Sequence, residues 1–350
     1  MPDTKATRAF ALKVWLLRQG ELVSHMITLG DRLGLFRGMV ERGPMTSTEL
    51  ATGTGLHERW VREWLACMAS AGLVELRAGE RFELTPEAAT VLTDETNPMC
   101  AIGAFSTPIG PDDLARLETA FRTGIGLTYD DLGPTKAHAT ERMLGPWITH
   151  SLVPTILPSL PDVYAALERG CRVADIGCGG GVALEAMARR FPNSQFHGYD
   201  PSTHAITRAR ERLAEVENAW ADVGRAEDLA HHGAFDFVVA LDCLHDMTDP
   251  AGAIAAVYDA LSDDGTWLIK DIRSTGDLAA NMKNPVMAMQ YAISIEVCMS
   301  SALSESGGAG LGTCGLHPDL AEAMCRDAGF TRFTLHDFGE PANLYYEVRP

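Results

Sequence analysis

The sequence predicts a mainly helical N-terminal domain followed by an α/β domain with a mostly parallel sheet. From about residue 170 onward, short apolar runs alternate with amphipathic helical stretches, which is typical of a parallel sheet covered by helices. The chain has 350 residues, more than one ordinary hydrophobic core contains. We therefore expect domains at 1–97 and 166–350, joined by a Pro- and Gly-rich helical connector at 98–165.

The first domain begins with a long stretch of apolar residues at helical spacing. Thr46 and Glu49 then form a capping-box signature, which predicts the start of a short helix. A second helix follows, and we expect one side of it to carry Trp60, Val61, Trp64, Leu65 and Met68. The next segment alternates and turns at Ala78 and Gly79, as a hairpin does. Helix, turn, helix and hairpin together are typical of a winged-helix domain.

Winged-helix domains often bind DNA, but the charge of this chain argues against that function. Its net charge is −18 and its pI is about 5.0, whereas phosphate binding requires a basic surface. The second helix mixes both signs of charge, with His57, Glu58, Arg59, Arg62 and Glu63. We expect no nucleic-acid partner, and we expect the long first helix to form a homodimer.

The composition is that of a globular protein, with 46% hydrophobic and 22% charged residues. The N-terminus does not have the pattern of a secretory signal, and no apolar stretch reaches the roughly 18–20 residues of a membrane span. The eight cysteines include no CxxC pair. We expect a cytoplasmic protein with reduced thiols, no membrane partner and no required metal, since no two histidines have the i, i+4 spacing of a helical metal site.

The second domain is expected to contain strands and helices in alternation. The predicted strands are 171–177, 195–200, 235–242 and 265–272, and the predicted helices between them are 182–191, 203–216 and 250–261. A helix at 318–329 and two strands at 330–338 and 343–349 close the chain. The segment 274–315 is too long for a simple loop, so we expect a helical insert there. Four of its side chains either line a pocket or pack in the core: Met287, Met289, Tyr291 and Met299.

A glycine-rich motif, "VADIGCGGG", joins the first predicted strand of this domain to its helix. Small residues here let a ligand approach the backbone, and the helix N-terminus supplies free N–H groups. A dinucleotide G-x-G-x-x-G pattern fails, because its third glycine would fall at Val182 or Leu184. No Gly-Lys-Ser/Thr follows either, which excludes a Walker loop. The spacing that fits is D-x-G-x-G-x-G, with Asp175, Gly177, Gly179 and Gly181.

Asp200 ends the second predicted strand, about twenty residues after the glycines. A carboxylate at this position is placed to accept hydrogen bonds from both ribose hydroxyls of an adenosine. Either motif alone is a weak signal. Both together, within the first βαβ unit of an α/β domain, strongly indicate an adenosine-containing ligand.

On these motifs and the final strand pair, residues 165–350 resemble the class I S-adenosylmethionine-dependent methyltransferases. The winged-helix pattern before them is similar to that of plant-type and bacterial O-methyltransferases, most of all an actinobacterial group whose insert also carries "GGAGLGT", here Gly307–Thr313. The resemblance implies a Rossmann-like domain with a seven-stranded, mostly parallel sheet. It also implies S-adenosyl-L-methionine as cofactor, bound over Gly177, Gly179 and Gly181 with Asp200 on the ribose.

The same resemblance implies further cofactor contacts. The family's "DAxDL" segment, which packs on adenine, reads "GRAEDL" here, with Arg225 where an aspartate is usual. The adenine contact then falls to the backbone of Ala226 and to Glu227. The "THS" segment corresponds to the place where the methionine carboxylate is held, which implicates Ser151. We expect Asp242 near the methionine end of the cofactor.

The stretch "CLHDM" places His245 and Asp246 just after a predicted strand. In plant-type O-methyltransferases a His-Asp pair stands at this position, and the histidine takes the proton from the acceptor hydroxyl. A base with a pKa near 6.5 is suited to that step at neutral pH. Asp271, at the end of the next strand, is the expected partner of the histidine, while Asp246 acts in the site or caps the following turn. The alternative is that the pair only satisfies backbone groups of the loop.

The leading hypothesis is therefore methylation of a small-molecule acceptor, at oxygen, with His245 as general base. Methylation of a thiol or an amine remains open, and a thiolate needs less help from a base. A winged-helix regulator that senses S-adenosylmethionine is the alternative from another class. Arsenite methylation is a weaker one, and it requires Cys243, Cys298 and Cys314 to converge.

Overall fold

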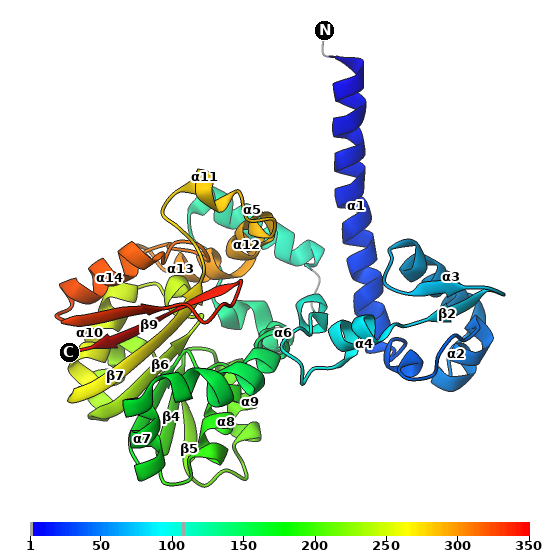
Figure 1. Cartoon of the computed structure of the whole chain (residues 1–350). Coiled ribbons are helices and arrows are strands. Elements are labelled where there is room, and N and C mark those ends of the chain that lie inside the picture. The colour runs from blue at the N-terminus through cyan, green and yellow to red at the C-terminus, as the bar shows by residue number, and fades with distance from the viewer. Residues whose placement is uncertain (1–2, 107–108) are drawn as a thin grey trace. The chain divides into compact units, whose positions relative to one another are not determined.

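A computed structural model describes residues 3–106 and 109–350 (Figure 1). The described chain forms two compact units, one of residues 3–106 and 142–147 and one of residues 109–141 and 148–350. The connector expected at 98–165 is therefore not a body of its own. Ile102 is buried in the core of the first unit, whereas Leu152 and Ile156 are buried in the second, so apolar burial divides the connector between the two.

The first unit contains the expected winged-helix elements. They are α1 (Thr4–Arg32), α2 (Ser47–Thr54), α3 (Glu58–Ser70), β1 (Glu75–Arg77), β2 (Arg81–Glu83) and α4 (Pro86–Thr93). The capping box is confirmed, since the Glu49 N–H donates to the Thr46 hydroxyl at 3.2 Å and the Thr46 N–H donates to the Glu49 carboxylate at 2.6 Å. The hairpin is also confirmed, and Gly79 adopts a positive φ of 74° in its turn.

Helix α3 buries one face against this unit's core. Val61, Leu65 and Met68 are buried, and the Trp64 indole N–H donates to the Met26 carbonyl of α1 at 2.9 Å. The placement of Trp60 on the same face was wrong, because its side chain is 79% exposed. One residue along a helix rotates the side chain by about 100°, which turns Trp60 away from the face that Val61 shares with the core.

Helix α1 packs on this core only near its C-terminal end. Residues 3–22 are exposed, and the first buried side chain is Ile27. The exposed part carries large apolar side chains, namely Phe10, Leu12, Val14, Trp15, Leu16, Leu17 and Leu22. Exposed apolar side chains in this number are typical of interaction surfaces.

The second unit is built on a seven-stranded sheet in the order β5-β4-β3-β6-β7-β9-β8. Its strands are β3 (Arg172–Ile176), β4 (Gln195–Asp200), β5 (Ala219–Val223), β6 (Phe235–Leu241), β7 (Leu261–Ile272), β8 (Arg332–His336) and β9 (Asn343–Arg349). Strands β3 to β7 pair in parallel, while β9 runs antiparallel to β7 and β8. This is the expected Rossmann-like arrangement. Helices cover both faces of the sheet (Figure 1).

The helices of this unit include the predicted ones and several from the connector and the insert. They are α5 (Pro111–Thr123), α6 (Tyr129–Trp147), whose last residues belong to the first unit, α7 (Pro161–Arg169), α8 (Val182–Arg190), α9 (Thr203–Arg212), α10 (Pro250–Ala260) and α14 (Pro318–Asp327). The insert contains α11 (Leu278–Asn281), α12 (Met287–Ile293), a π-helical turn η7 (Ser294–Cys298) and α13 (Met299–Ala302). Among the helices of the described residues, none is long and apolar enough to cross a lipid bilayer.

The core of the second unit lies around the central strands, where Val238, Trp267, Ile269 and Tyr346 are almost wholly buried. Because β3, β4, β6 and β7 are parallel, their carboxyl ends meet at one edge of the sheet. Ligands of open α/β sheets bind at this edge. The polar residues that the sequence places at strand ends are thereby gathered in one region.

Candidate active site

The glycine motif forms the turn between β3 and α8. Gly177, Gly179 and Gly181 all have positive φ values, of 69°, 52° and 74°, which side-chain-bearing residues rarely adopt. A Cβ atom on Gly177 would lie 2.7 Å from the Cβ of Cys243, whereas one on Gly179 would have no atom within 4 Å. The loop is thus closely packed against Cys243 at Gly177 and open at Gly179. An open position is what a ligand needs to approach the backbone.

Asp200 closes this loop from the end of β4. Its carboxylate accepts the Gly179 N–H at 2.9 Å and the Ser202 N–H at 2.8 Å. Burial raises the pKa of Asp200 to about 6, against the effect of these two N–H groups. Each carboxylate oxygen has a second lone pair, so the group retains acceptor capacity for ribose hydroxyls.

Asp175 lies in β3 directly before the loop and is 1% exposed. Neither of its oxygens has a hydrogen-bond partner among the described residues, and burial raises its pKa well above the ordinary range. An unpartnered buried carboxylate is costly and calls for an explanation. A hydrogen-bond donor of a bound cofactor would satisfy it, so the residues present fit the cofactor that the glycine motif implies.

The first half of α6 packs beside the glycine loop and α9. Asp130 accepts hydrogen bonds from the hydroxyls of Ser202 and Thr203, both at 2.6 Å. Glu141 forms ion pairs with Arg208 and Arg212. The Arg212 side chain also donates to the carbonyl of Gly180 at 2.9 Å. The sequence interpretation missed these residues, because two acidic side chains in a Pro- and Gly-rich segment carry no local signal of where they pack.

His245 lies in a short turn, η6 (Leu244–Asp246), directly after β6, and is 2% exposed. Its Nδ1 is 2.8 Å from an oxygen of Asp271, which is fully buried near the end of β7. Since a carboxylate only accepts, Nδ1–H is the donor, and the neutral ring carries its lone pair on Nε2. The expected pairing of His245 with Asp271 is present.

The pKa of His245 reflects two opposed influences. Burial by itself lowers it, but the charge of Asp271 and the hydrogen bond to it prevail, so the pKa lies well above its ordinary value of 6.5. Asp271 therefore stabilises the protonated form of the His245 ring. A base of this kind holds a proton strongly once it has taken one.

Asp246 does not cap the following turn. That cap is Asp249, whose carboxylate accepts the Gly252 N–H at 2.9 Å. Asp246 instead accepts the phenol O–H of Tyr129, from the start of α6, at 2.6 Å. Burial raises the pKa of Asp246 to about 7. The alternative that the His245–Asp246 pair serves only the loop backbone does not fit these side-chain partners.

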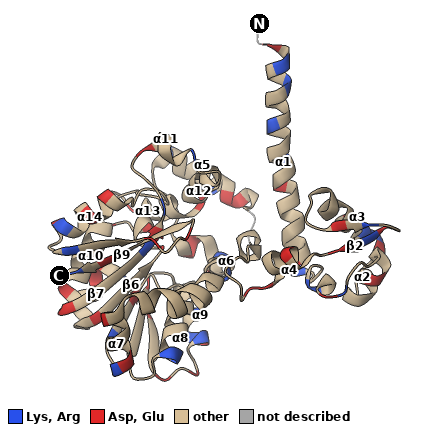
Figure 2. Ribbon diagram, in the orientation of Figure 1, with Lys and Arg blue, Asp and Glu red and all other residues tan. Residues whose placement is uncertain are grey.

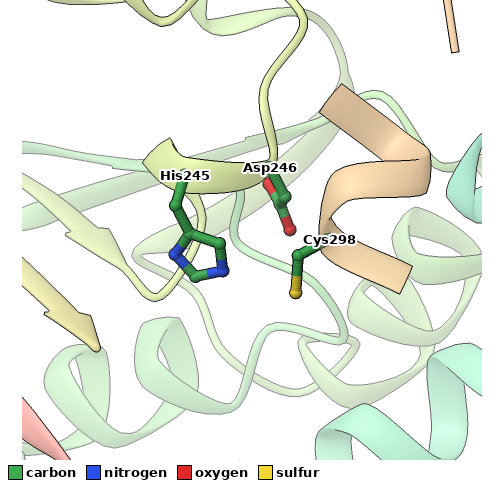
Figure 3. A group of neighbouring side chains, drawn as sticks. All are labelled: His245, Asp246 and Cys298. Atoms are coloured by element: carbon green, nitrogen blue, oxygen red, sulfur yellow. The ribbon is translucent and has the colours of Figure 1, made fainter. Parts of the chain in front are cut away.

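The insert brings Cys298 to the same place. Figure 3 shows His245 and Asp246 on one turn and Cys298 on the facing helix, with one ring nitrogen of His245 pointing toward the thiol. Candidate ligand atoms of these three buried side chains all lie within 4.8 Å of one another. Cys243 is not part of the group, because its thiol donates to the Ile176 carbonyl at 3.1 Å. The three cysteines that arsenite methylation would require therefore do not converge.

Asp242 sits in a strained conformation at the end of β6, with φ of 58°. Its carboxylate forms an ion pair with Lys270 of β7 and accepts a hydrogen bond from the Asn343 amide of β9 at 2.7 Å. The same amide donates to the Asp271 carbonyl at 3.3 Å. Asn343 thus links the two strand ends that carry Asp242 and Asp271.

The remaining expected contacts lie on neighbouring elements. Ala226 is buried and Glu227 partly exposed at the start of the turn η5 (Ala226–His232), which follows the edge strand β5 beside Asp200. Glu227 pairs with Arg225, which also reaches Glu305 of the insert at 2.6 Å. Ser151 is half-buried in a π-helical turn, η3 (Ile148–Ile156), that packs on α8.

Among the candidate pocket residues of the insert, Met287 is buried and its sulfur lies 3.5 Å from that of Cys314. Met289 is 52% exposed, so it does not line an enclosed pocket in this structure. Tyr129 is a further site residue that sequence interpretation missed, and Cys298 was considered only together with Cys243 and Cys314, not as a neighbour of His245. Nothing in the local sequence marks either of them.

Comparison with known proteins agrees with this geometry. Residues 174–267 match a family model described as a methyltransferase domain, and residues 22–94 match an Rv2258c-like winged HTH domain. Two curated relatives are ubiquinone biosynthesis O-methyltransferases. The one from Neisseria meningitidis is 36% identical over 198 residues, which is 53% of this chain and 72% of the relative. The one from Alkalilimnicola ehrlichii is 37% identical over 111 residues, 31% of this chain and 43% of the relative.

A solved structure extends the similarity to the whole fold. The human N-acetylserotonin methyltransferase in complex with SAM superposes with a TM-score of 0.64 at 16% identity, over 100% of this chain and 99% of that one. With the glycine loop, Asp200 and the sheet order already described, these matches show the family. The chain belongs to the class I S-adenosylmethionine-dependent methyltransferases, with a winged-helix domain ahead of the cofactor-binding domain.

Proposed function

We propose that the protein methylates a small-molecule acceptor at oxygen, with His245 as the general base. The observation that carries the proposal is the buried pair of His245 and Asp271, 2.8 Å apart, on the ligand-binding edge of the sheet. The hydrogen bond to Asp271 uses Nδ1, so Nε2 is the ring nitrogen proposed to accept the proton. The curated relatives described above are named as O-methyltransferases, which supports oxygen as the acceptor atom.

The residues proposed to hold S-adenosylmethionine are those gathered at the glycine loop. Gly177, Gly179 and Gly181 provide close backbone approach, and Asp200 accepts from the ribose hydroxyls. Further contacts are proposed for Asp175, Ser151, Ala226, Glu227 and Asp242. The cofactor supplies a methyl group on a sulfonium, which is electrophilic without further activation.

The chain's own task is to make the acceptor nucleophilic. A neutral hydroxyl is a weak nucleophile, so its proton must leave as the new bond forms. His245 Nε2 takes that proton, and Asp271 stabilises the resulting imidazolium through Nδ1–H. The hydrogen bond from Tyr129 to Asp246 joins the start of α6 to the turn that carries His245.

The charge on the winged helix supports an enzyme rather than a regulator. Both arginines of α3 pair with glutamates of the same helix, Arg59 with Glu63 and Arg62 with Glu58. Figure 2 shows ribbon segments of Lys and Arg interspersed with those of Asp and Glu around α2 and α3. A helix that reads DNA presents unpaired basic groups to the phosphates. We therefore propose that this domain forms a homodimer through the exposed apolar part of α1.

A screen of phenols, amines and thiols tests the proposed reaction. The measurement is S-adenosylhomocysteine release, with mass spectrometry of the methylated product. We expect turnover with hydroxyl acceptors and an O-methyl product. Tight cofactor binding without turnover on any acceptor, together with a salt-dependent DNA complex, would favour the sensing regulator. An S-methyl product that forms equally well without His245 would favour the thiol alternative.

A further inference from the structure

The side chains of His245, Asp246 and Cys298 present one nitrogen, one oxygen and one sulfur donor to a common point (Figure 3). We propose that this group binds a Zn²⁺ ion, and that the ion inhibits methyl transfer by occupying the Nε2 lone pair that His245 needs as a base. The binding part of the proposal goes beyond the proposed function and does not depend on it. Only the inhibition of methyl transfer rests on the proposed function, because it requires His245 to act as the base.

The donor set matches the preferences of zinc. Zn²⁺ binds imidazole nitrogen, thiolate sulfur and carboxylate oxygen at about 2.0–2.3 Å, in tetrahedral geometry, with an open position where three protein ligands are used. Tetrahedral ligands at those lengths are about 3.3–3.8 Å apart. The three candidate ligand atoms lie within 4.8 Å of one another, so small side-chain rotations bring them to a common ion.

The surroundings of the ligands are those of a prepared site. Metal-bound histidines donate their second N–H to a carboxylate, which fixes the ring and makes the ligand more basic. Asp271 does this for His245, at 2.8 Å. Tyr129 holds one oxygen of Asp246 at 2.6 Å and leaves the other for a ligand bond. Two of the three ligands are thus oriented by Asp271 and Tyr129 before any ion arrives.

The insert that carries the third ligand, Cys298, is hydrogen-bonded through its glycine-rich end to the segment that carries His245 and Asp246. The Gly312 N–H donates to the His245 carbonyl at 3.0 Å, and the Ala309 N–H donates to the Thr248 carbonyl at 2.9 Å. The insert that carries Cys298 is therefore attached to the turn that carries the other two ligands.

The charge balance also favours a cation. On binding, the Cys298 S–H bond breaks, sulfur keeps the electron pair for the metal, and the thiol proton leaves to solvent. Any proton on His245 Nε2 or on the Asp246 carboxyl leaves to solvent in the same way, because only the unprotonated groups bind a metal. The dication then faces the thiolate and the Asp246 carboxylate, whose two negative charges it balances. A buried carboxylate and thiolate without a cation carry a large desolvation cost.

The test uses the full-length protein after dialysis against EDTA, titrated with Co²⁺ and then with Zn²⁺. We expect one Co²⁺ per chain, a thiolate-to-metal charge-transfer absorption, and its loss as Zn²⁺ displaces Co²⁺. Calorimetry with Zn²⁺ should show about 10–100-fold weaker binding in Asp271→Asn, and at least that loss in Cys298→Ser. Cys325→Ser, a buried cysteine of α14, is the matched control and should bind like the parent.

Absence of the charge-transfer absorption, or equal Zn²⁺ affinity in Cys298→Ser and the parent, would overturn the proposal. If Cys298→Ser does not fold by circular dichroism, Asp246→Asn replaces it and must weaken binding. A double variant of His231 and His232 removes the exposed surface histidines, and stoichiometric binding must survive there. In an active preparation Zn²⁺ should inhibit and EDTA should restore turnover. The Co²⁺ spectrum can be read even if no acceptor is turned over, so the two proposals fail separately.

Discussion

At the scale of single residues, the site depends on how burial and charge act on a few side chains. Asp271 raises the pKa of His245 above 6.5 despite burial, and burial raises the pKa of Asp200 to about 6. The two upward pKa shifts have opposite effects on the charged form, since the first stabilises a charged imidazolium and the second destabilises a charged carboxylate. In the proposed reaction, the imidazolium charge forms when His245 takes a proton. The Asp200 shift instead reflects the free energy lost when its carboxylate is buried away from water.

The pH dependence of the reaction follows from the His245 shift. Only the neutral ring accepts a proton, so kcat/KM should fall as pH drops through the pKa of His245, with a midpoint above 6.5. Asp271→Asn removes the stabilising charge while burial remains, so the midpoint should move to lower pH. The measurement is a pH profile of kcat/KM for both proteins. An unchanged midpoint would show that another group controls the profile.

Cofactor affinity should depend on the charge of Asp200. Asp200→Asn keeps a carbonyl for the Gly179 N–H but loses charged acceptance of the ribose hydroxyls. A hydrogen bond to a charged group is worth about 1.5–3 kcal/mol, so we expect about 10–100-fold weaker S-adenosylmethionine binding by calorimetry. Asp222→Asn, on the surface of β5, is the control and should bind normally. Equal affinity in Asp200→Asn and the parent would remove Asp200 from the cofactor site.

At the scale of elements, local patterns predicted most of the fold. The capping box, the hairpin turn and the alternating strands and helices depend on neighbours in sequence, and these predictions were correct. Strand β5 was not predicted, because it is a short edge strand in which only Ala219 and Ala221 are buried. Such a segment shows little of the apolar content by which strands are identified.

The candidate site was only partly predictable, and for a physical reason. Asp200, His245 and Asp271 end parallel strands, so topology alone brings them to one edge. Tyr129 and Cys298 reach the site from α6 and the insert, which are far from η6 in sequence. Their placement depends on how those helices pack over the sheet. No spacing rule in the sequence encodes that packing.

A substitution in the turn between β3 and α8 tests why that turn requires glycine at position 177. Gly177→Ala places a side chain at φ of 69°, which costs about 1–2 kcal/mol, and adds a contact 2.7 Å from the Cys243 Cβ. Gly34→Ala is the matched control, since it has the same φ of 69° but no atom within 4 Å. We expect the free energy of unfolding, from denaturant titration, to fall more in Gly177→Ala. Equal losses would mean that the loop adjusts to the added methyl group.

At the scale of the whole molecule, the candidate active site and the exposed apolar helix belong to different units. The second unit contains the glycine loop, the carboxylates and the His245 site, all within described residues 109–141 and 148–350. The first unit contributes a winged-helix core and a long helix whose apolar side chains are exposed over residues 3–22. Under the proposed function, the second unit carries out methyl transfer and the first unit forms the homodimer.

The proposed homodimer should depend on that exposed helix. Trp15 and Leu17 are 72% and 69% exposed, and burying them against a second copy would supply several kcal/mol of apolar transfer. The double change of Trp15→Glu and Leu17→Glu should convert a dimer to a monomer in analytical ultracentrifugation. Leu76→Glu, on the exposed hairpin, should leave the dimer intact. A dimer that persists in the double variant would place the interface elsewhere.

The role of His245 is open to one decisive kinetic comparison. General base catalysis contributes about 10²–10⁴-fold, so His245→Ala should lower kcat/KM toward a hydroxyl acceptor by that factor. Its S-adenosylmethionine affinity should stay unchanged. His231→Ala, at an exposed histidine, should retain parental kinetics. A His245→Ala enzyme that methylates the same hydroxyl within a few-fold of the parental rate would contradict the assignment of His245 as the base.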